Sequence, residues 1–563
     1  MKKISRIKIA FLFVAAAVLP VVAQTTDNRR VIIVGATPTP TPVVRVSPTP
    51  TPVVKTVSVP TPTPKPPVSG GATSIAELQS RIQQILLRPE LRRGHIGLKV
   101  VSLDTGKVVY AENAEKYFMP ASNMKSFTVA TALEKLTPDF HFVTSVFAPA
   151  RPDANGVVRG DLTIFGRGDI SFSTAFYGGD YYKGLDALAD KIVQAGVKRV
   201  EGSLVGDESY FTGSPIAYGW EWDDLQWYDG AEVSALPLND NALDLAVRPS
   251  SPGNPCIVSL LPVNPVMRIV NNCRTSDKSV KRDLTVKKGL DQNVVEVSGT
   301  MPAGDKGFTN YLTVTHPADL FVALLRQRLE QKGVVVTGPT RVVGAKEKAF
   351  LAVASTVPPV QLATLESPPF SVIAAKTMKP SQNMYTETIL WTLGQEGRSA
   401  TLTTAATPET NPFLDPKSTS EERGRFVVRS FLNEVGIPAD GIVQYDGSGL
   451  SRHNLVTPEA LVQLYTYMAK RSRFADAWLN SLTVAGVDGT LRNRFKGTSG
   501  AGNVRGKTGT LDQVSALSGY VTTAAGEKLV FSILVNDVPN ARLRPSIIDE
   551  IVLSLANFNG TVN

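Results

Sequence analysis

The sequence PASNMK at residues 120–125 leads into the apolar segment 127–133, for which the sequence predicts a helix. Ser122 and Lys125 are three residues apart, so a helix would place the lysine amine within hydrogen-bonding reach of the serine hydroxyl. A neutral amine there can take the hydroxyl proton, and the positive end of the helix favours the anion that forms. The spacing alone is weak support, because residues 5–8 repeat it and a serine at a helix start is commonly an N-cap.

Two further polar motifs lie far downstream. Ser381 and Asn383 belong to MKPSQNMYTETIL (378–390), where a proline and a helix start place polar side chains at the mouth of a helix. The other motif is KTGT (507–510), at the start of a predicted strand. Its glycine lets a ligand backbone approach a strand edge, and its lysine and threonine can bind a carboxylate. The ordinary alternatives are an N-cap for the first motif and a tight turn for the second.

The order Ser-x-x-Lys, Ser-x-Asn, Lys-Thr-Gly is typical of penicillin-binding proteins and class A β-lactamases. The chain resembles one group of these, the D-alanyl-D-alanine carboxypeptidase/endopeptidases of the low-molecular-mass, class C type, peptidase family S13. The resemblance extends from about residue 75 to the end of the chain. It also rests on the segments FMPASNMK (118–125), GRGD (166–169), GWEWDD (219–224), VSALPLNDNALDL (233–245), DGSGLSRHN (446–454) and VAGVDGTLRNRF (484–495).

The resemblance implies a role for each motif residue. Ser122 would be the acylated nucleophile, and Lys125 would be its general base. Ser381 would relay a proton to the leaving amine, while Asn383 would orient the substrate peptide. Lys507 would polarise Ser381 and bind the terminal carboxylate of the substrate. Thr508, Gly509 and Thr510 would bind the substrate. The backbone N–H groups of Ser122 and Thr510 would form the oxyanion hole.

The family also binds a side chain of the stem peptide near the catalytic cleft. By the same resemblance, Asp223 or Asp224 would hold the free amine of a diamino acid, and Arg452 would meet its carboxylate. A turn-capping aspartate and a surface arginine are the alternatives. Asp512 stands where some relatives carry an amide, so their side-chain recognition does not carry over in detail. His453 is expected to be structural.

The proposed chemistry requires no metal and no other cofactor. Two lysines near one small site lower each other's proton affinity, so one can be a neutral base near pH 7 while the other stays charged. With four histidines and two cysteines, the chain is neither a multi-zinc protein nor a disulfide-scaffolded miniprotein. Cys256 and Cys273 are compatible with a disulfide in an exported chain and equally with two buried thiols.

The N-terminus predicts export. Residues 1–23 contain four bases and no acid, an apolar run too short to span a bilayer, and small residues before Gln24, which together indicate a signal peptide. An uncleaved N-terminal anchor is the alternative. Without this segment the formal net charge falls from +9 to +5, too small and dispersed an excess to favour nucleic acid. Residues 24–73 predict a Thr/Pro-rich linker, and the TP repeats at 37–67 within it predict an extended polyproline II conformation.

The resemblance implies an α+β fold: a β-lactamase/DD-peptidase-like catalytic domain, with an antiparallel sheet flanked by helices on both faces, interrupted by two smaller β-rich domains. We assign residues 74–141 and 366–563 to the catalytic domain and 142–365 to the insertion. A capping-box pattern at Ser74 and Glu77 opens an apolar helical stripe, and a hairpin follows. The C-terminus mirrors this order with a hairpin and then a helix. This symmetry predicts that the two ends of the chain build one sheet.

We therefore expect a serine-type D-Ala-D-Ala carboxypeptidase, DD-endopeptidase, or both, which acts on peptidoglycan stem peptides through an acyl-serine intermediate and is inhibited by β-lactams. The two activities differ only in the leaving group, and the sequence does not separate them. The location would be the periplasm or the extracellular cell envelope, with wall or membrane-surface association and oligomeric state left open. A β-lactamase and a non-enzymatic wall-binding scaffold are the alternative functions.

Overall fold

The computed structural model describes residues 70–352, 358–397 and 411–562. These residues belong to the compact unit that spans residues 62–563. The predicted signal peptide and all but the last residues of the predicted linker lie outside the described residues. Within the described ranges, no helix has the length and hydropathy needed to cross a membrane.

Six strands of the described chain form one antiparallel sheet in the spatial order β19-β20-β21-β22-β1-β2. Strand β1, near the N-terminus, pairs with β22, near the C-terminus, from His95 opposite Asn536 to Ser102 opposite Leu529. The prediction that the two ends of the chain build one sheet is therefore confirmed. The strands are β1 (His95–Ser102), β2 (Val108–Glu112), β19 (Thr483–Val484), β20 (Arg505–Leu511), β21 (Val514–Thr522) and β22 (Lys528–Asn536).

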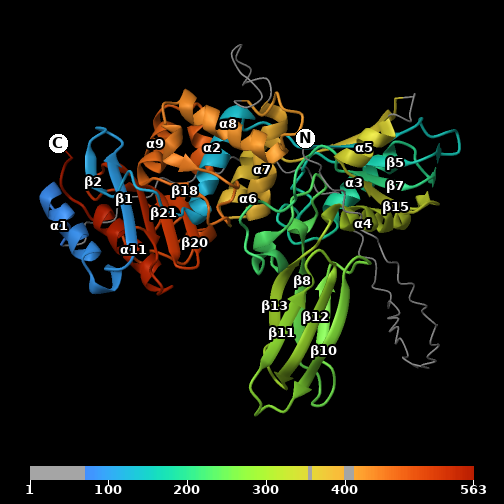
Figure 1. Cartoon of the computed structure of the whole chain (residues 1–563), viewed down its shortest axis with the longest axis horizontal. Coiled ribbons are helices and arrows are strands. Elements are labelled where there is room, and N and C mark those ends of the chain that lie inside the picture. The colour runs from blue at the N-terminus through green and yellow to red at the C-terminus, as the bar shows by residue number, and fades with distance from the viewer. Residues whose placement is uncertain (1–69, 353–357, 398–410, 563) are drawn as a thin grey trace, which may run out of the picture. The chain divides into compact units, whose positions relative to one another are not determined.

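Helices cover both faces of this sheet (Figure 1). Alternate residues of a strand point to opposite faces. The odd-numbered residues 529–535 of β22 accordingly pack with one group of helices, whereas Val530 and Leu534 pack with the other. The first group is α1 (Ile75–Leu86) and α11 (Leu543–Ala556); the second is α2 (Lys125–Lys135), α6 (Phe370–Met378), α7 (Asn383–Glu396), α8 (Ser420–Glu434), α9 (Pro458–Lys470) and α10 (Ala475–Ser481).

The first helix begins as its sequence predicts, with one change in the cap. Ser74 is the N-cap, and its hydroxyl accepts a hydrogen bond from the Glu77 N–H. The Glu77 carboxylate, however, accepts from the backbone N–H of Thr73 rather than that of Ser74. The reciprocal half of the capping box is therefore displaced by one residue, because Thr73 offers Glu77 both an N–H and a hydroxyl.

The section between residues 142 and 365 contains helices as well as strands. Helices α3 (Lys183–Gln194) and α4 (Pro317–Gln331) bury their apolar faces in one core together with strand residues such as Ile164. The strands described here form a five-stranded mixed sheet, β15-β7-β5-β3-β16, and a parallel one, β14-β6-β4. Their bounds are β3 (Val143–Ala148), β4 (Val157–Arg159), β5 (Leu162–Phe165), β6 (Arg199–Glu201), β7 (Leu204–Asp207), β14 (Val335–Val336), β15 (Thr340–Val343) and β16 (Val360–Glu366), with helix α5 (Ala345–Ala352) before β16.

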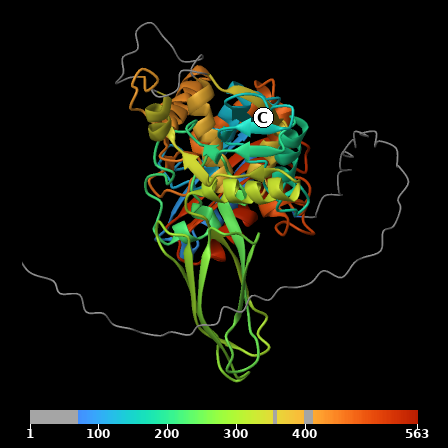
Figure 2. The same ribbon diagram turned by 90° about the vertical axis from the view of Figure 1, so that its right-hand side faces the viewer.

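Two further three-stranded sheets, β13-β8-β9 and β10-β12-β11, share that core and run side by side in both views (Figures 1 and 2). Strand β12 pairs in parallel with β10 and antiparallel with β11. These strands are β8 (Ala242–Arg248), β9 (Ile257–Leu261), β10 (Arg268–Ser276), β11 (Asp283–Lys288), β12 (Val294–Pro302) and β13 (Phe308–Thr313).

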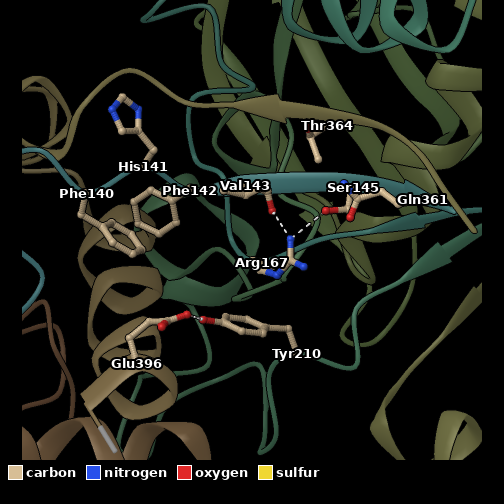
Figure 3. Close-up of a pocket in the computed structure, with 10 residues that line it drawn as sticks. All are labelled: Phe140, His141, Phe142, Val143, Ser145, Arg167, Tyr210, Gln361, Thr364 and Glu396. Carbon is tan, nitrogen blue, oxygen red and sulfur yellow. Dashed lines mark hydrogen bonds between the residues drawn. The ribbon is translucent and has the colours of Figure 1, made fainter. Parts of the chain in front are cut away.

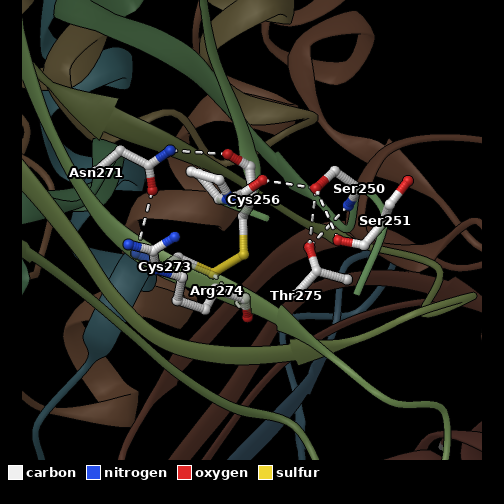
Figure 4. Close-up of a disulfide and its surroundings, with 8 residues drawn as sticks. Ser250, Ser251, Cys256, Asn271, Cys273, Arg274 and Thr275 are labelled. Carbon is white, nitrogen blue, oxygen red and sulfur yellow. Dashed lines mark hydrogen bonds between the residues drawn. A yellow bond between two sulfur atoms is a disulfide. The ribbon is translucent and has the colours of Figure 1, made fainter. Parts of the chain in front are cut away.

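A disulfide between Cys256 and Cys273 joins the start of β9 to β10 (Figure 4). Both cysteines are buried, and the Cys256 N–H donates to the Cys273 carbonyl. The Asn271 side chain reinforces this link, because its amide nitrogen donates to the Cys256 carbonyl while its oxygen accepts from the Cys273 N–H. Of the two states that the sequence leaves open for these cysteines, the structure has the disulfide.

Strands β3 and β16 stand at the two ends of the section assigned to the insertion, and they pair with each other from Val143 opposite Glu366 to Ala148 opposite Val360. The chain thus leaves and rejoins the part that contains α2 and α6 at neighbouring positions. This pairing agrees with boundaries near residues 142 and 365, which remain a prediction.

Candidate active site

Ser122 lies on a short 3₁₀ turn, η2 (Ala121–Met124), directly before α2. Lys125 is the first residue of α2, so the two are one helical turn apart, and the Lys125 Nζ lies 2.8 Å from the Ser122 Oγ. Ala121, before the serine, has a left-handed φ of 46°. Such strain in a non-glycine residue persists only where its surroundings hold it, as is common beside functional groups.

The amine of Lys125 is fully buried and meets three oxygen atoms. Besides Ser122, it donates to the Asn383 Oδ1 at 2.6 Å and to the Ser448 carbonyl at 2.8 Å. Burial lowers the pKa of Lys125 to about 8, against the opposing attraction of nearby carboxylates, Glu387 first. About a tenth of such amines are neutral at pH 7, and a neutral amine can accept the proton of Ser122.

Ser381 lies between α6 and α7 in a left-handed conformation, with φ 68°. Its hydroxyl accepts a hydrogen bond from the buried Lys507 Nζ at 2.8 Å, and the same amine donates to the Thr508 carbonyl at 2.7 Å. Burial, and then the charge of Lys125, lower the pKa of Lys507. The expected electrostatic coupling between the two lysines is therefore present in the folded chain.

A close packing contact requires a glycine at position 509. A Cβ atom at Gly509 would lie 2.5 Å from the Pro120 carbonyl oxygen and 3.1 Å from the Ala121 Cβ. The glycine therefore lets β20 approach the turn that carries Ser122, and its predicted role in substrate binding stays a prediction. The Asn123 amide nitrogen closes the same contact by donating to the Lys507 carbonyl at 3.1 Å.

The two threonines of the KTGT motif differ in their surroundings. The Thr508 hydroxyl is buried and donates to the Thr490 hydroxyl at 2.6 Å, so the 484–495 segment contacts β20 here. Thr510 is exposed. Strand β19 pairs only with Arg505 and Gly506 of β20, so within the described residues the strand from position 507 onward has a strand partner on one side only.

Two buried carboxylates that the motifs did not identify support the Lys125 site. Glu387 accepts hydrogen bonds from the N–H groups of Gly447 (2.9 Å) and Ser448 (2.7 Å), which hold the carbonyl that Lys125 contacts. Burial, and then the charge of Asp446, raise the pKa of Glu387 to about 8. A sequence signal existed: Glu387 is four residues after Asn383 and therefore lies on the same face of α7.

Asp446 organises the remainder of the DGSGLSRHN segment. It accepts hydrogen bonds from the Asn454 amide at 2.7 Å and from the Trp220 indole N–H at 3.0 Å. It also accepts from the backbone N–H groups of Gly449 and Ser451. The GWEWDD segment is thereby attached to the loop that contacts Lys125.

The residues assigned to side-chain recognition gather at this attachment. Arg452 forms an ion pair with Glu221 (3.0 Å) and donates to the Asp512 carbonyl (3.1 Å), close to the end of β20. Burial, and then the charge of Asp223, raise the pKa of the half-buried Asp224 to about 6. The structure thus places Arg452 beside an acidic segment, but its ion-pair partner is Glu221 rather than either predicted aspartate. The neighbouring His453 ring packs on Tyr218, with 5.1 Å between centroids.

The described ranges contain no group of three or more histidine, cysteine or acidic side chains arranged to hold a metal ion. Instead, hydrogen bonds of two lysine amines organise the site: Lys125 contacts Ser122 and Asn383, and Lys507 contacts Ser381. Each amine touches one hydroxyl group that is partly accessible to solvent. An arrangement of this kind can deprotonate one hydroxyl and reprotonate a leaving group, which are the steps of acyl transfer.

The chain matches the D-Ala-D-Ala carboxypeptidase 3 (S13) family over residues 78–558. It belongs to this family. It is 33% identical over 497 residues to a D-alanyl-D-alanine carboxypeptidase of Actinomadura sp. (strain R39), a match that covers 86% of each chain. It is 25% identical over 448 residues to the D-alanyl-D-alanine carboxypeptidase DacB of Haemophilus influenzae, covering 78% of this chain and 85% of that protein.

The fold agrees with this membership. The crystal structure of penicillin binding protein 4 (dacB) from Haemophilus influenzae superposes with a TM-score of 0.69 at 23% identity, covering 84% of this chain and 98% of that one. The α+β fold predicted from the motifs, with additional domains, is therefore confirmed. Membership therefore places the chain among peptidases.

Proposed function

We propose that the chain is a serine-type D-Ala-D-Ala carboxypeptidase or DD-endopeptidase that acts on peptidoglycan stem peptides through an acyl-Ser122 intermediate. The observation that carries this proposal is the buried Lys125 amine, 2.8 Å from the partly exposed Ser122, with the Lys507–Ser381 pair connected to it through the Asn123–Lys507 and Lys125–Asn383 hydrogen bonds. Family membership supports the substrate class.

Acylation begins at Lys125. The neutral amine takes the Ser122 proton, and the Oγ bonds to the carbonyl carbon of the penultimate D-alanine. The N–H groups of Ser122 and Thr510 stabilise the oxyanion. Ser381 then gives its proton to the leaving nitrogen and receives one from Lys507. The C–N bond breaks, D-alanine or a diamino-acid amine departs, and the acyl ester of Ser122 remains.

Deacylation returns both lysines to the protonation states that they had before acylation. Water attacks the ester carbonyl and passes its proton to the Ser381–Lys507 pair. The ester C–O bond breaks, and the Ser122 Oγ recovers a proton from Lys125. Acylation and deacylation together hydrolyse one amide bond, and no atom changes its oxidation state.

The substrate carboxylate has a role in this sequence. Lys507 loses proton affinity through burial and through Lys125. A carboxylate that binds beside Lys507 and Thr508 raises that affinity and so keeps Lys507 protonated as the proton donor. The part of β20 from residue 507 onward, paired on one side, offers backbone groups along which a peptide can extend. Asn383 would orient that peptide.

Side-chain recognition is proposed for the acidic segment beside Arg452. Glu221, Asp223 and Asp224 supply negative charge for the amine of a diamino acid, and Arg452 would exchange Glu221 for the carboxylate of that residue. We also propose export to the periplasm or cell envelope through residues 1–23.

Relatives support β-lactam sensitivity. A Dictyostelium discoideum relative, 25% identical, is called penicillin-sensitive carboxypeptidase A. The Haemophilus influenzae penicillin binding protein 4 has also been solved in complex with a β-lactam. For the present chain, we expect one fluorescent penicillin to attach covalently per molecule, at Ser122.

The test is mass spectrometry of the purified protein after exposure to penicillin, followed by incubation with pentapeptide and with cross-linked muropeptides. A long-lived adduct on Ser122 together with release of D-alanine supports carboxypeptidase action, and cleavage of the cross-link supports endopeptidase action. Rapid hydrolysis of the adduct without peptide turnover would indicate a β-lactamase. An adduct that persists in Ser122→Ala would overturn the assignment of the nucleophile.

A further inference from the structure

A cavity of about 390 Å³ lies at the far end of α7 from Asn383 (Figure 3). One wall is formed by residues 140–145, which lead into and begin β3, and another by Gln361 and Thr364 of β16. Arg167 and Tyr210 complete it together with Glu396, the last residue of α7. The volume is within the range of small-ligand sites, roughly 300–1,000 Å³.

Arg167 reaches the cavity from the GRGD segment, whose other members are fixed in the interior. A Cβ at Gly166 would lie 2.1 Å from the Ala235 carbonyl oxygen, Gly168 has φ 80°, and Asp169 is buried. These three residues pack the loop and leave Arg167 as the member of the segment that lines the cavity. The proposed reaction makes no use of it.

The guanidinium of Arg167 is held in one orientation. Its Nη1 donates to the Val143 carbonyl and to the buried Ser145 Oγ, each at 3.0 Å, and the group lies 4.6 Å from the centre of the Phe165 ring. Among the described residues, no carboxylate lies within 4.0 Å of it, and its Nε and Nη2 have no hydrogen-bond acceptor. A positioned guanidinium with unused donors is suited to a planar anion such as a carboxylate.

The opposite side of the cavity carries a negative charge. The Tyr210 hydroxyl donates to the Glu396 Oε1, and in Figure 3 Arg167 lies between the edge of β3 and the Tyr210 ring. Glu396 is exposed and forms no ion pair with any described basic side chain. The cavity therefore presents a cation on one side and an anion on the other, which suits a ligand with both a carboxylate and an amine.

We propose that this cavity binds a second stem peptide of peptidoglycan, with a free carboxylate at Arg167 and a free amine at Glu396. The inference rests on the proposed function, because it takes the same polymer as its ligand. The 14-residue α7 separates Asn383 from Glu396 by about 20 Å at 1.5 Å per residue. Residues 383–394 of α7 are buried, so a fragment that occupies both places must pass around the helix and be longer than this distance. Occupancy here would favour cross-linked over single-stem substrates.

The experiment isolates the cavity by first acylating Ser122 with penicillin. The probe is the fluorescein-labelled tripeptide L-Ala-γ-D-Glu-meso-diaminopimelate, which lacks D-Ala-D-Ala, and binding to the penicilloyl-protein is followed by fluorescence anisotropy. We expect saturable binding that weakens by about tenfold in Arg167→Gln and in Glu396→Gln, since each removes one charged contact. Arg429→Gln, at an exposed arginine of α8, is the matched control and should bind as the unmodified chain does.

Glu396→Gln keeps the inference testable if Arg167→Gln fails to fold, because Glu396 is exposed. No binding to the penicilloyl-protein, or binding that neither variant weakens, would overturn the inference and leave the proposed function intact. Failure of penicillin to acylate Ser122 would instead contradict the proposed function. In that case the same anisotropy measurement on the unreacted protein still decides whether the cavity binds the tripeptide. With active protein, both variants should lose about tenfold in kcat/KM on a cross-linked dimer relative to a pentapeptide.

Discussion

Besides the Lys507–Ser381 pair, two buried lysine amines of the described chain lie beside a hydroxyl and look alike at close range. At the candidate active site, the Lys125 amine lies 2.8 Å from the Ser122 hydroxyl; in the section with β11, the Lys288 amine lies 2.7 Å from the Thr315 hydroxyl. Burial lowers the pKa of both lysines, and nearby carboxylates oppose the shift in both places. Proximity and a perturbed amine therefore do not distinguish a catalytic pair from a structural one.

Access to the hydroxyl and the contacts of the amine distinguish them. Thr315 is 3% exposed and its hydroxyl is enclosed, whereas Ser122 is partly exposed at the start of a helix. Lys125 also contacts Asn383 and the Ser448 carbonyl. A substrate carbonyl can reach the Ser122 hydroxyl and not that of Thr315, so of these two pairs we propose only the first for acyl transfer.

The strongest test replaces each lysine with methionine, which has similar length and no charge. Lys125→Met removes the base that accepts the Ser122 proton, so the rate of acylation by a fluorescent penicillin should fall by about 10²–10⁴. Lys288→Met should leave that rate within about twofold, because its hydroxyl partner is enclosed. Stopped-flow fluorescence measures both rates, and circular dichroism checks that each variant is folded. A comparable loss of acylation rate in both variants would contradict the distinction between the Lys125 and Lys288 pairs.

The second test concerns the approach of β20 to the nucleophile. Gly509→Ala places a methyl group 2.5 Å from a backbone oxygen, so β20 must move away from η2. We expect a loss of about 1–3 kcal/mol in the free energy of unfolding and acylation slower by more than about tenfold. In Gly289→Ala, after β11, the nearest atoms belong to the flexible Gln292 side chain at 3.3 Å, so both quantities should change little. Urea unfolding and acylation rates report the two effects, and a tolerated Gly509→Ala would contradict the assigned contact.

The third test uses pH. The active form of Lys125 is the neutral amine, so acylation should rise with pH through a midpoint near the pKa of about 8. The charge of Glu387 raises the pKa of Lys125. Glu387→Gln removes that attraction, so the midpoint should move to lower pH by about one unit.

The matched control for this pH profile is Glu232→Gln, because Glu232 raises the pKa of Lys288 rather than that of Lys125. Its midpoint should stay in place. An upward or absent shift in Glu387→Gln would show that Glu387 acts only through the loop that it holds. The rate of acylation in that variant at high pH separates lost positioning from the change in proton affinity.

The smallest effect on catalysis is expected from the disulfide. Replacing Cys256 and Cys273 together by alanine removes a covalent link across 17 positions, which should cost about 3 kcal/mol in the stability of the section it closes. Differential scanning calorimetry should show a lower transition temperature, while acylation at 25 °C stays unchanged. Slower acylation in this variant would show that the cleft depends on that section.

Much of the fold was predictable because it depends on local patterns. The apolar stripe of α1, the paired hairpins at the two ends and the helix after Ser122 follow from spacing alone. Helices α3 and α4 belong to a section predicted as β-rich because its short strands dominate the pattern; the apolar stripe of α3 at Leu185, Leu188 and Ile192 was a usable signal that this prediction missed. The local positions of the motif residues were also predictable, since Ser122 and Lys125 lie at the start of α2, Asn383 begins α7 and Lys507 lies on β20, whereas their catalytic roles stay a prediction.

The amino-acid sequence determined which chemical groups are present and on which local elements they lie, since helix starts and strand alternation depend on near neighbours. Only the tertiary structure decided that Glu387 and Asp446 hold the Ser448 carbonyl at Lys125, that Gly509 faces Pro120, and that Lys288 is enclosed. These contacts join residues tens to hundreds of positions apart. Burial and electrostatic coupling depend on distance in space, which one-dimensional spacing does not contain.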